Sequence, residues 1–129
     1  MPQSHLRAIN GLRPLQWSQE LAVAAQTEAT LLAATDCPAT PPPATGIEAT
    51  SGPAGSTDSQ IIDQWVAEGQ YYDYASNTCA AGHTCAQYTQ IVWKNTTSVG
   101  CADATARNGA LVVTCVYSPP GDIPGQRPY

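Results

Sequence analysis

The segment 99–117 constrains the fold more than any other part of this chain, because it predicts a β-hairpin. Residues 99–104 and 110–117 predict two strands. Asn108 and Gly109 stand between them, and an Asn-Gly pair is a strong signal for the turn that joins two hairpin strands. Any fold for this chain therefore includes two adjacent antiparallel strands near its C-terminal end.

A helix is predicted over residues 19–34, with Ser18 as its N-cap. Side chains that recur near helical spacing place Leu21, Ala25 and Leu32 on the buried side of this helix. Its many small alanines would allow close packing against a sheet.

Two more helices are predicted, one over 58–68 with Asp58 as its N-cap and one over 87–92. The stretch 36–57 carries prolines and glycines that a helix cannot run through, and a short strand is expected over 47–50. A loop of that length is unusual in a compact domain and is therefore functional or mobile. Helices mixed with hairpin strands predict an α+β fold, and the length of 129 residues predicts one domain.

The charge of the chain excludes several classes of function. The formal net charge is −5, and the five lysines and arginines are spread along the sequence. Nucleic-acid binding and attraction to anionic membranes both depend on clustered basic residues, so we expect neither. No apolar run approaches the roughly 20 residues of a transmembrane helix. The start at Met1 is interpreted as a truncation that has removed a targeting segment.

The cysteines indicate where the protein resides. Five cysteines in so small a chain predict an oxidising compartment. Their odd number leaves at least one cysteine outside any intramolecular pair.

Residues 85–95 read Cys-Ala-Gln-Tyr-Thr-Gln-Ile-Val-Trp-Lys-Asn, and residues 99–102 read Val-Gly-Cys-Ala. This stretch resembles the signature of the CAP superfamily of cysteine-rich secretory proteins, antigen 5 and pathogenesis-related class 1 proteins, which usually reads Cys-Gly-His-Tyr-Thr-Gln-Val-Val-Trp. Residues 113–121, Val-Thr-Cys-Val-Tyr-Ser-Pro-Pro-Gly, are similar to the second signature of the family. The resemblance is to the plant or fungal class 1 type and runs from about Ala8 to Tyr129.

This resemblance implies the architecture of the whole chain. We expect a single CAP domain over 1–129, with a truncated N-terminus and an extended C-terminal tail over about 118–129. The fold that it implies is an α–β–α sandwich, with a small antiparallel sheet between helices.

The resemblance also implies two disulfides, Cys79–Cys85 and Cys101–Cys115. The third disulfide of the family would join Cys37 to a position near Ala106, which is not a cysteine here. Cys37 is therefore expected to be free, either as a buried inert side chain or as a reactive or intermolecular thiol.

Many CAP proteins hold a metal with two histidines and two acids, and here both histidines are absent. The acids match Glu48 and Glu68, whereas the histidine positions match Pro41 and Gln87. We therefore expect no metal and no cofactor. Three alternatives are open for the acids: weak binding of a hard cation, a shared proton, or hydrogen bonds to Gln87 and the backbone. His83, in the small disulfide loop, is a weak candidate for a replacement ligand.

Two further features bear on function. Asn95-Thr96-Thr97 is an N-glycosylation triplet. Tyr88 and Trp93 are candidates for lining an apolar cleft, although such residues more often pack in a core. No nucleophile motif is present, so no catalytic residue is assigned.

The resemblance implies a secreted, extracellular, monomeric and non-enzymatic protein. Its implied role is binding or export of a sterol or fatty acid in host–pathogen defence or virulence. Residues 48–60 contain no aromatic side chain, which weakens sterol binding through that loop; fatty-acid binding between helices does not need the loop. The alternative is a protein–protein effector or defence signal that a host protein recognises through the proline-rich loop and the exposed tail. A metal-dependent hydrolase, which would need Glu48 and Glu68, is a third and weaker interpretation.

Overall fold

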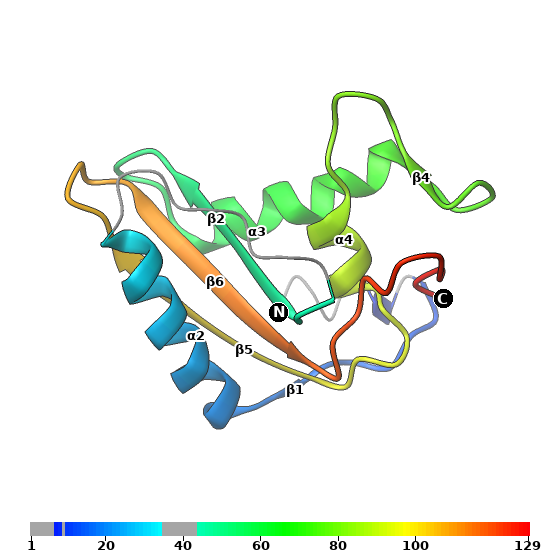
Figure 1. Cartoon of the computed structure of the whole chain (residues 1–129), viewed down its shortest axis with the longest axis horizontal. Coiled ribbons are helices and arrows are strands. Elements are labelled where there is room, and N and C mark those ends of the chain that lie inside the picture. The colour runs from blue at the N-terminus through cyan, green and yellow to red at the C-terminus, as the bar shows by residue number, and fades with distance from the viewer. Residues whose placement is uncertain (1–6, 9, 35–43) are drawn as a thin grey trace.

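The computed structural model describes residues 7–8, 10–34 and 44–129, and Figure 1 shows how its helices and strands are arranged. None of the helices in these ranges is long and apolar enough to cross a membrane. In chain order the elements are β1 (Gln16–Trp17), α2 (Gln19–Ala33), β2 (Ile47–Gly52), α3 (Asp58–Ala67), the 3₁₀-helix η1 (Glu68–Tyr71), β3 (Tyr72–Asp73), β4 (Thr78–Cys79), α4 (Ala86–Ile91), β5 (Ser98–Thr105) and β6 (Leu111–Ser118).

The predicted hairpin is the centre of a four-stranded sheet with the order β1-β5-β6-β2. Strands β5 and β6 pair antiparallel from Ser98↔Ser118 to Thr105↔Leu111, so β5 is one residue longer at each end than predicted and β6 is shifted by one residue. Gly109 turns the chain with a φ of +87°, which a glycine adopts without strain. The expectation of a purely antiparallel sheet is wrong at one edge, because β1 pairs parallel to β5.

Helices cover both faces of this sheet, so the structure is the expected α–β–α sandwich (Figure 1). Helix α2 packs against β5 and β6 on one face, whereas α3 and α4 pack together over the other. The larger core lies on the α3–α4 side. Its buried members are Leu15, Ile61, Trp65, Tyr88, Ile91, Val92, Val99, Val113, Cys115 and Tyr117.

Helix α2 begins where the sequence predicts, because the Ser18 side chain accepts a hydrogen bond from the Leu21 backbone N–H at 3.2 Å. The predicted buried face is wrong for Leu21 and Leu32, which are only partly buried. A stripe of alanines faces the sheet instead, because the backbones of α2 and β5 approach closely at Gly100 and leave room only for methyl groups. The buried alanines are Ala22, Ala25, Ala29 and Ala33.

The sequence predicts Asp58 as the N-cap of helix α3, and this is wrong. The N-cap is Thr57. The Thr57 hydroxyl accepts from the Gln60 N–H at 3.2 Å, and the Gln60 side chain accepts from the Thr57 N–H at 3.0 Å. This reciprocal capping box satisfies two N–H groups at once, whereas a cap at Asp58 would lack the second bond. The helix ends at Ala67 and continues as η1.

Both disulfides implied by the resemblance are present. Cys101 and Cys115 face each other directly across the β5–β6 ladder, and Cys79–Cys85 closes the short loop before α4. Cys37 and Pro41 lie outside the described residues.

Thr114 offers a direct test of packing between the sheet and α2. Its side chain in the middle of β6 is fully buried, and its hydroxyl has no hydrogen-bond partner among the described residues. An unpaired buried hydroxyl destabilises a fold, so Thr114→Val is expected to stabilise the protein by about 1 kcal/mol and raise Tm by a few degrees. Thermal unfolding followed by circular dichroism checks this. A lower Tm would mean that the hydroxyl does have a partner.

Candidate functional site

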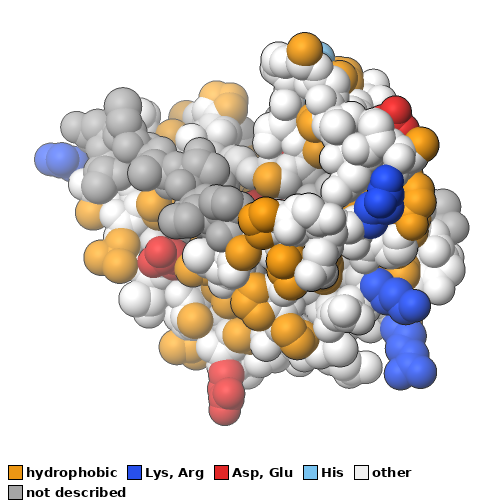
Figure 2. All heavy atoms as spheres, turned by 45° about the vertical axis from the view of Figure 1, so that its right-hand side comes forward, with side chains coloured by type: hydrophobic (Ala, Val, Ile, Leu, Met, Phe, Trp, Pro, Cys, Tyr) orange, Lys and Arg blue, Asp and Glu red, His pale blue; other side chains and the backbone are white. Residues whose placement is uncertain are grey.

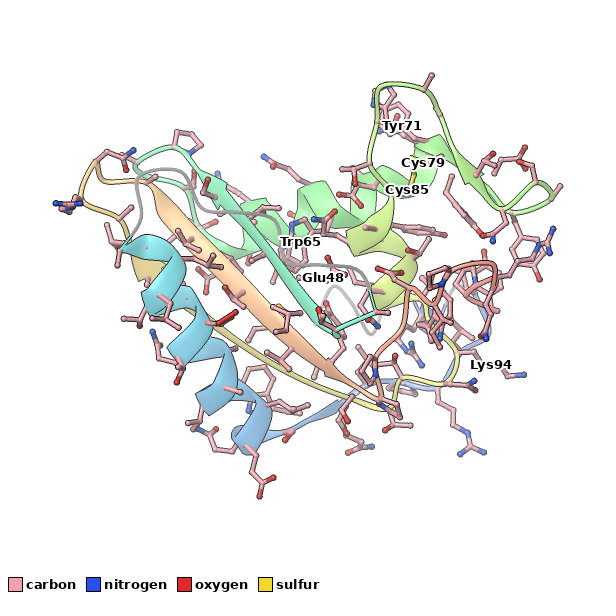
Figure 3. The ribbon with its side chains drawn as sticks, viewed as in Figure 1. Glu48, Trp65, Tyr71, Cys79, Cys85 and Lys94 are labelled. Carbon is pink, nitrogen blue, oxygen red and sulfur yellow. A yellow bond between two sulfur atoms is a disulfide. The ribbon has the colours of Figure 1, made fainter. Side chains whose placement is uncertain are left out.

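Glu48, Glu68 and Gln87 come together on the side of the sheet that α3 and α4 cover. Glu48 lies on β2 opposite Cys115 and is 7% exposed (Figure 3). Glu68 opens η1, directly after α3, and Gln87 lies in the first turn of α4 with 4% of its surface exposed. The fourth position of the family's metal site, Pro41, is outside the described residues.

Gln87 binds Glu68 through hydrogen bonds. With its amide oriented so that the nitrogen faces the acid, Gln87 Nε2 donates to the two carboxylate oxygens of Glu68 at 2.7 and 3.2 Å. The Tyr88 backbone N–H donates to Glu68 Oε1 at 3.0 Å. Burial raises the pKa of Glu68 to about 7, and the hydrogen bonds from Tyr88 and Gln87 oppose that rise. The Gln87 amide is thus hydrogen-bonded to the carboxylate that would bind a metal in other members of the family.

Asp122 is a third acid of this site, and the sequence analysis did not identify it. Thr89 Oγ1 donates to Asp122 Oδ1 at 2.5 Å. The other oxygen, Oδ2, is buried and meets no N–H or hydroxyl donor among the described residues. Asp122 directly follows the second signature, and its φ of +54° turns the chain back towards α4. The only signal in the sequence was this position next to the motif.

Glu48 is the titratable neighbour of Asp122 in this site. Burial raises the pKa of Glu48 to about 9, and the neighbouring charge of Asp122, its hydrogen bond and the charge of Glu68 raise it further. Burial also raises the pKa of Asp122. Two neighbouring buried carboxyl groups are unfavourable when both are ionised, so we expect Glu48, with the pKa raised to about 9, to keep a proton beside Asp122 at neutral pH. The structure thus places Asp122, rather than Glu68, in the shared-proton pair with Glu48.

These residues do not fit the zinc site of the family. Zinc favours imidazole and thiolate ligands, and this site offers carboxyl groups and an amide whose nitrogen faces an acid. In the described ranges, no three His, Cys, Asp or Glu side chains are placed to hold one metal ion. His83 is exposed in the disulfide loop and stacks on Tyr71, with ring centroids 3.7 Å apart.

Gln90 holds the C-terminal segment 119–129 against the domain. Its Oε1 accepts from the Gly121 N–H at 2.8 Å, and its Nε2 donates to Thr96 Oγ1 at 3.0 Å. Thr96 Oγ1 in turn donates to the Pro119 carbonyl at 2.7 Å. The prediction of an exposed tail is wrong for Gly121 and Pro128, which are buried. The reason is that the polar side chains of the first signature satisfy the backbone of this segment.

A cleft of about 410 Å³ opens between the disulfide loop and the C-terminal segment. Trp93, one of the two residues predicted to line a cleft, lies in its wall. Tyr88 does not line it and packs in the core, where burial raises its pKa to about 12. Figure 2 brings this side of the molecule forward and shows hydrophobic side chains among white polar side chains and backbone, with Lys and Arg side chains beside them. The cleft also includes Tyr72, His83, Thr84, Thr89, Asp122 and Ile123.

Comparison with known proteins agrees with this fold and these motifs. Residues 3–117 match the model of the CAP, or cysteine-rich secretory protein, family. The chain is 43% identical over 125 residues to pathogenesis-related protein 1A of Nicotiana tabacum, covering 95% of this chain and 74% of that protein. It is 38% identical to pathogenesis-related protein PRMS of Zea mays, covering 99% of this chain and 78% of that protein. The crystal structure of MpPR-1i soaked with selenourea superposes with a TM-score of 0.68 at 23% identity, covering 96% of this chain and 90% of that one. The chain therefore belongs to the cysteine-rich secretory protein family and is a pathogenesis-related protein of the class 1 type.

Proposed function

We propose that this protein is secreted and acts as a non-enzymatic binding protein, with the cleft beside the C-terminal segment as its ligand site. The central acids support a structural role for the former metal site. Gln87 and Tyr88 donate hydrogen bonds to the Glu68 carboxylate, and the Glu48 and Asp122 carboxyl groups lie beside each other. Carboxyl groups whose hydrogen bonds are already made within the protein are poorly placed to activate water or a substrate.

The cleft has the size and chemistry for a small amphiphilic ligand. About 410 Å³ lies within the roughly 300–1,000 Å³ that is usual for small-molecule sites. Tyr72, Trp93 and Ile123 contribute apolar surface, and Thr84 and Asp122 contribute polar groups. No residue of 48–60 lines this cleft, so the polar character of that loop does not count against it.

Of the two lipid classes that the family suggests, the cleft favours a sterol over a fatty acid. A sterol brings no charge into the cleft, and its single hydroxyl can bond Thr84 in the wall, which Asp122 also lines. The carboxylate of a fatty acid would face the negative charge of the same aspartate, and like charges in a cleft repel. The presence of Asp122 in the wall is the observation on which this choice rests.

A binding assay with labelled sterol and labelled fatty acid, with and without zinc or magnesium, tests the proposal. We expect saturable sterol binding that the metals do not change. Ile123→Glu is expected to weaken it about tenfold, or about 1.4 kcal/mol, by placing a second carboxylate in the cleft. Leu31→Glu is the matched control, because Leu31 is an exposed apolar residue of α2 outside this cleft. Equal sterol affinity of both variants and the wild type would rule out the cleft as the site.

Recognition by a protein partner is the second candidate function. Trp17, Val23 and Leu31 are 51%, 59% and 61% exposed, an unusual exposure for large apolar side chains close together on β1 and α2. Residues 36–43 of the proline-rich stretch 36–57, which hold four of its five prolines, lie outside the described residues. Absence of both sterol and fatty-acid binding would favour this function over lipid binding.

A further inference from the structure

Two triplets of this sequence have the form of an N-glycosylation acceptor or its cysteine variant. They are Asn95-Thr96-Thr97, between α4 and β5, and Asn77-Thr78-Cys79, at the β3–β4 turn. Such triplets are common by chance, so the surroundings of each asparagine have to distinguish them.

The surroundings of Asn95 leave its side chain open to modification. Asn95 and Thr97 are both exposed, and within the described ranges the Asn95 side chain makes no hydrogen bond. Thr96, between them, is fully buried and is held through its hydroxyl by Gln90 and the Pro119 carbonyl. The middle residue therefore anchors the backbone while the Asn95 side chain is exposed; Thr97 is also exposed, and its hydroxyl donates to the Ser118 carbonyl at 3.3 Å. A glycan on Asn95 would break no contact of the fold.

The side chain of Asn77, in contrast, is held by hydrogen bonds on both its oxygen and its nitrogen. Its Oδ1 accepts from the Tyr72 hydroxyl at 2.7 Å, and its Nδ2 donates to the Gln126 carbonyl at 3.1 Å. The third residue of this triplet, Cys79, is held in a disulfide. A glycan on Asn77 would replace one of the two Nδ2 hydrogens and place a sugar ring at the nitrogen that lies 3.1 Å from the Gln126 carbonyl, where it would crowd the C-terminal segment.

We propose that Asn95 is an N-linked glycosylation site and that Asn77 is not modified. The donor is an oligosaccharide carried on a lipid diphosphate. Asn95 Nδ2 forms a bond to the anomeric carbon of the first sugar and loses a proton, and the lipid diphosphate leaves. This inference rests on the secretory route proposed above, and it does not depend on what occupies the cleft.

The glycan leaves the surface beside the end of the chain. The backbone N–H of Lys94, the residue before Asn95, donates to the Pro128 carbonyl at 2.8 Å. Figure 3 labels Lys94 on the side of the molecule where the C-terminal segment lies. The oligosaccharide would therefore stand next to residues 128–129.

The test is to secrete the full chain from a eukaryotic host behind a cleavable leader and to measure its intact mass before and after peptide-N-glycosidase treatment. We expect one glycan on the wild type and on Asn77→Gln and Thr97→Ser, and none on Asn95→Gln and Thr97→Ala. Asn95→Gln is expected to melt close to the enzymatically deglycosylated wild type, because the Asn95 side chain makes no contact.

Ala110→Thr is the positive control, because it completes a triplet at the exposed Asn108 of the hairpin turn. A wild type secreted at its bare polypeptide mass, beside an Ala110→Thr variant that gains a glycan, would overturn the proposal. A glycan found on Asn77 would also overturn it. Sterol binding is measured separately on the deglycosylated protein, so failure of the lipid proposal and failure of this one are distinguishable.

Discussion

Replacement of Gly100 by alanine is expected to destabilise the fold by more than about 4 kcal/mol, a large part of the roughly 5–15 kcal/mol that stabilises a small domain. A Cβ at this position would lie 2.1 Å from the Ala22 nitrogen and 2.6 Å from the Ser18 carbonyl oxygen. Both atoms belong to the backbone at the start of α2 and cannot rotate away. The helix would have to move off the sheet and expose its buried alanine stripe.

Gly55→Ala is the matched control for this substitution. A Cβ on Gly55 would meet no atom within 4 Å, although its φ of +90° makes any side chain somewhat strained. Gly55→Ala is therefore expected to lower the free energy of unfolding by about 1 kcal/mol. Urea unfolding of both variants gives the comparison. A Gly100→Ala variant as stable as Gly55→Ala would show that α2 and β5 can separate without cost.

Raising the pH from about 5 to about 9 is expected to destabilise the protein strongly. The pKa values of Glu48 and Glu68 are raised to about 9 and about 7 in the folded state, from 4.5. The pKa of Asp58, beside Asp103, is raised from 3.8 to about 6. Each group binds more protons when folded, so the free energy of unfolding falls as the pH rises from the unfolded pKa to the folded one. For one proton the slope is at most about 1.4 kcal/mol per pH unit.

Glu48→Gln isolates the largest contribution to this pH dependence. The amide keeps a donor for Asp122 but has no proton to release. At about pH 8 the free energy of unfolding of the variant is therefore expected to be higher than that of the wild type by on the order of 2 kcal/mol. The two proteins should converge at about pH 4. Glu20→Gln, at an exposed position in the first turn of α2, is the control. Chemical denaturation across this pH range provides the measurement, and parallel curves for Glu48→Gln and wild type would refute the shared-proton pair.

The sequence predicted the secondary structure well where the signals were local. The helix after Ser18, the hairpin around Asn108-Gly109 and the short helix before Trp93 all lie within a few residues of their predicted positions. The cap of α3 was missed because Thr57 acts together with Gln60, and Asp58 alone looked like an equally good cap. A capping box depends on two residues three positions apart and is therefore easily overlooked.

The candidate site was only partly predictable. The family resemblance gave Glu48, Glu68 and Gln87 as neighbours, and the structure brings these residues to one place. It gave no indication that Asp122 is the partner of Glu48 or that Gln90 holds the segment that carries Asp122. Both contacts depend on how the last residues fold back over α4.

By itself, the sequence determined the α+β class and the central hairpin of this protein, because turn chemistry and helical periodicity act over short distances along the chain. The cysteine pairs followed from the family resemblance. Only the tertiary structure decided which groups share the buried site. Glu48 and Asp122 lie 74 residues apart in the sequence (122 − 48), and their pKa values rise because burial removes water from both carboxyl groups at once. Desolvation of that kind depends on every element packed around a group, and no local pattern of residues encodes it.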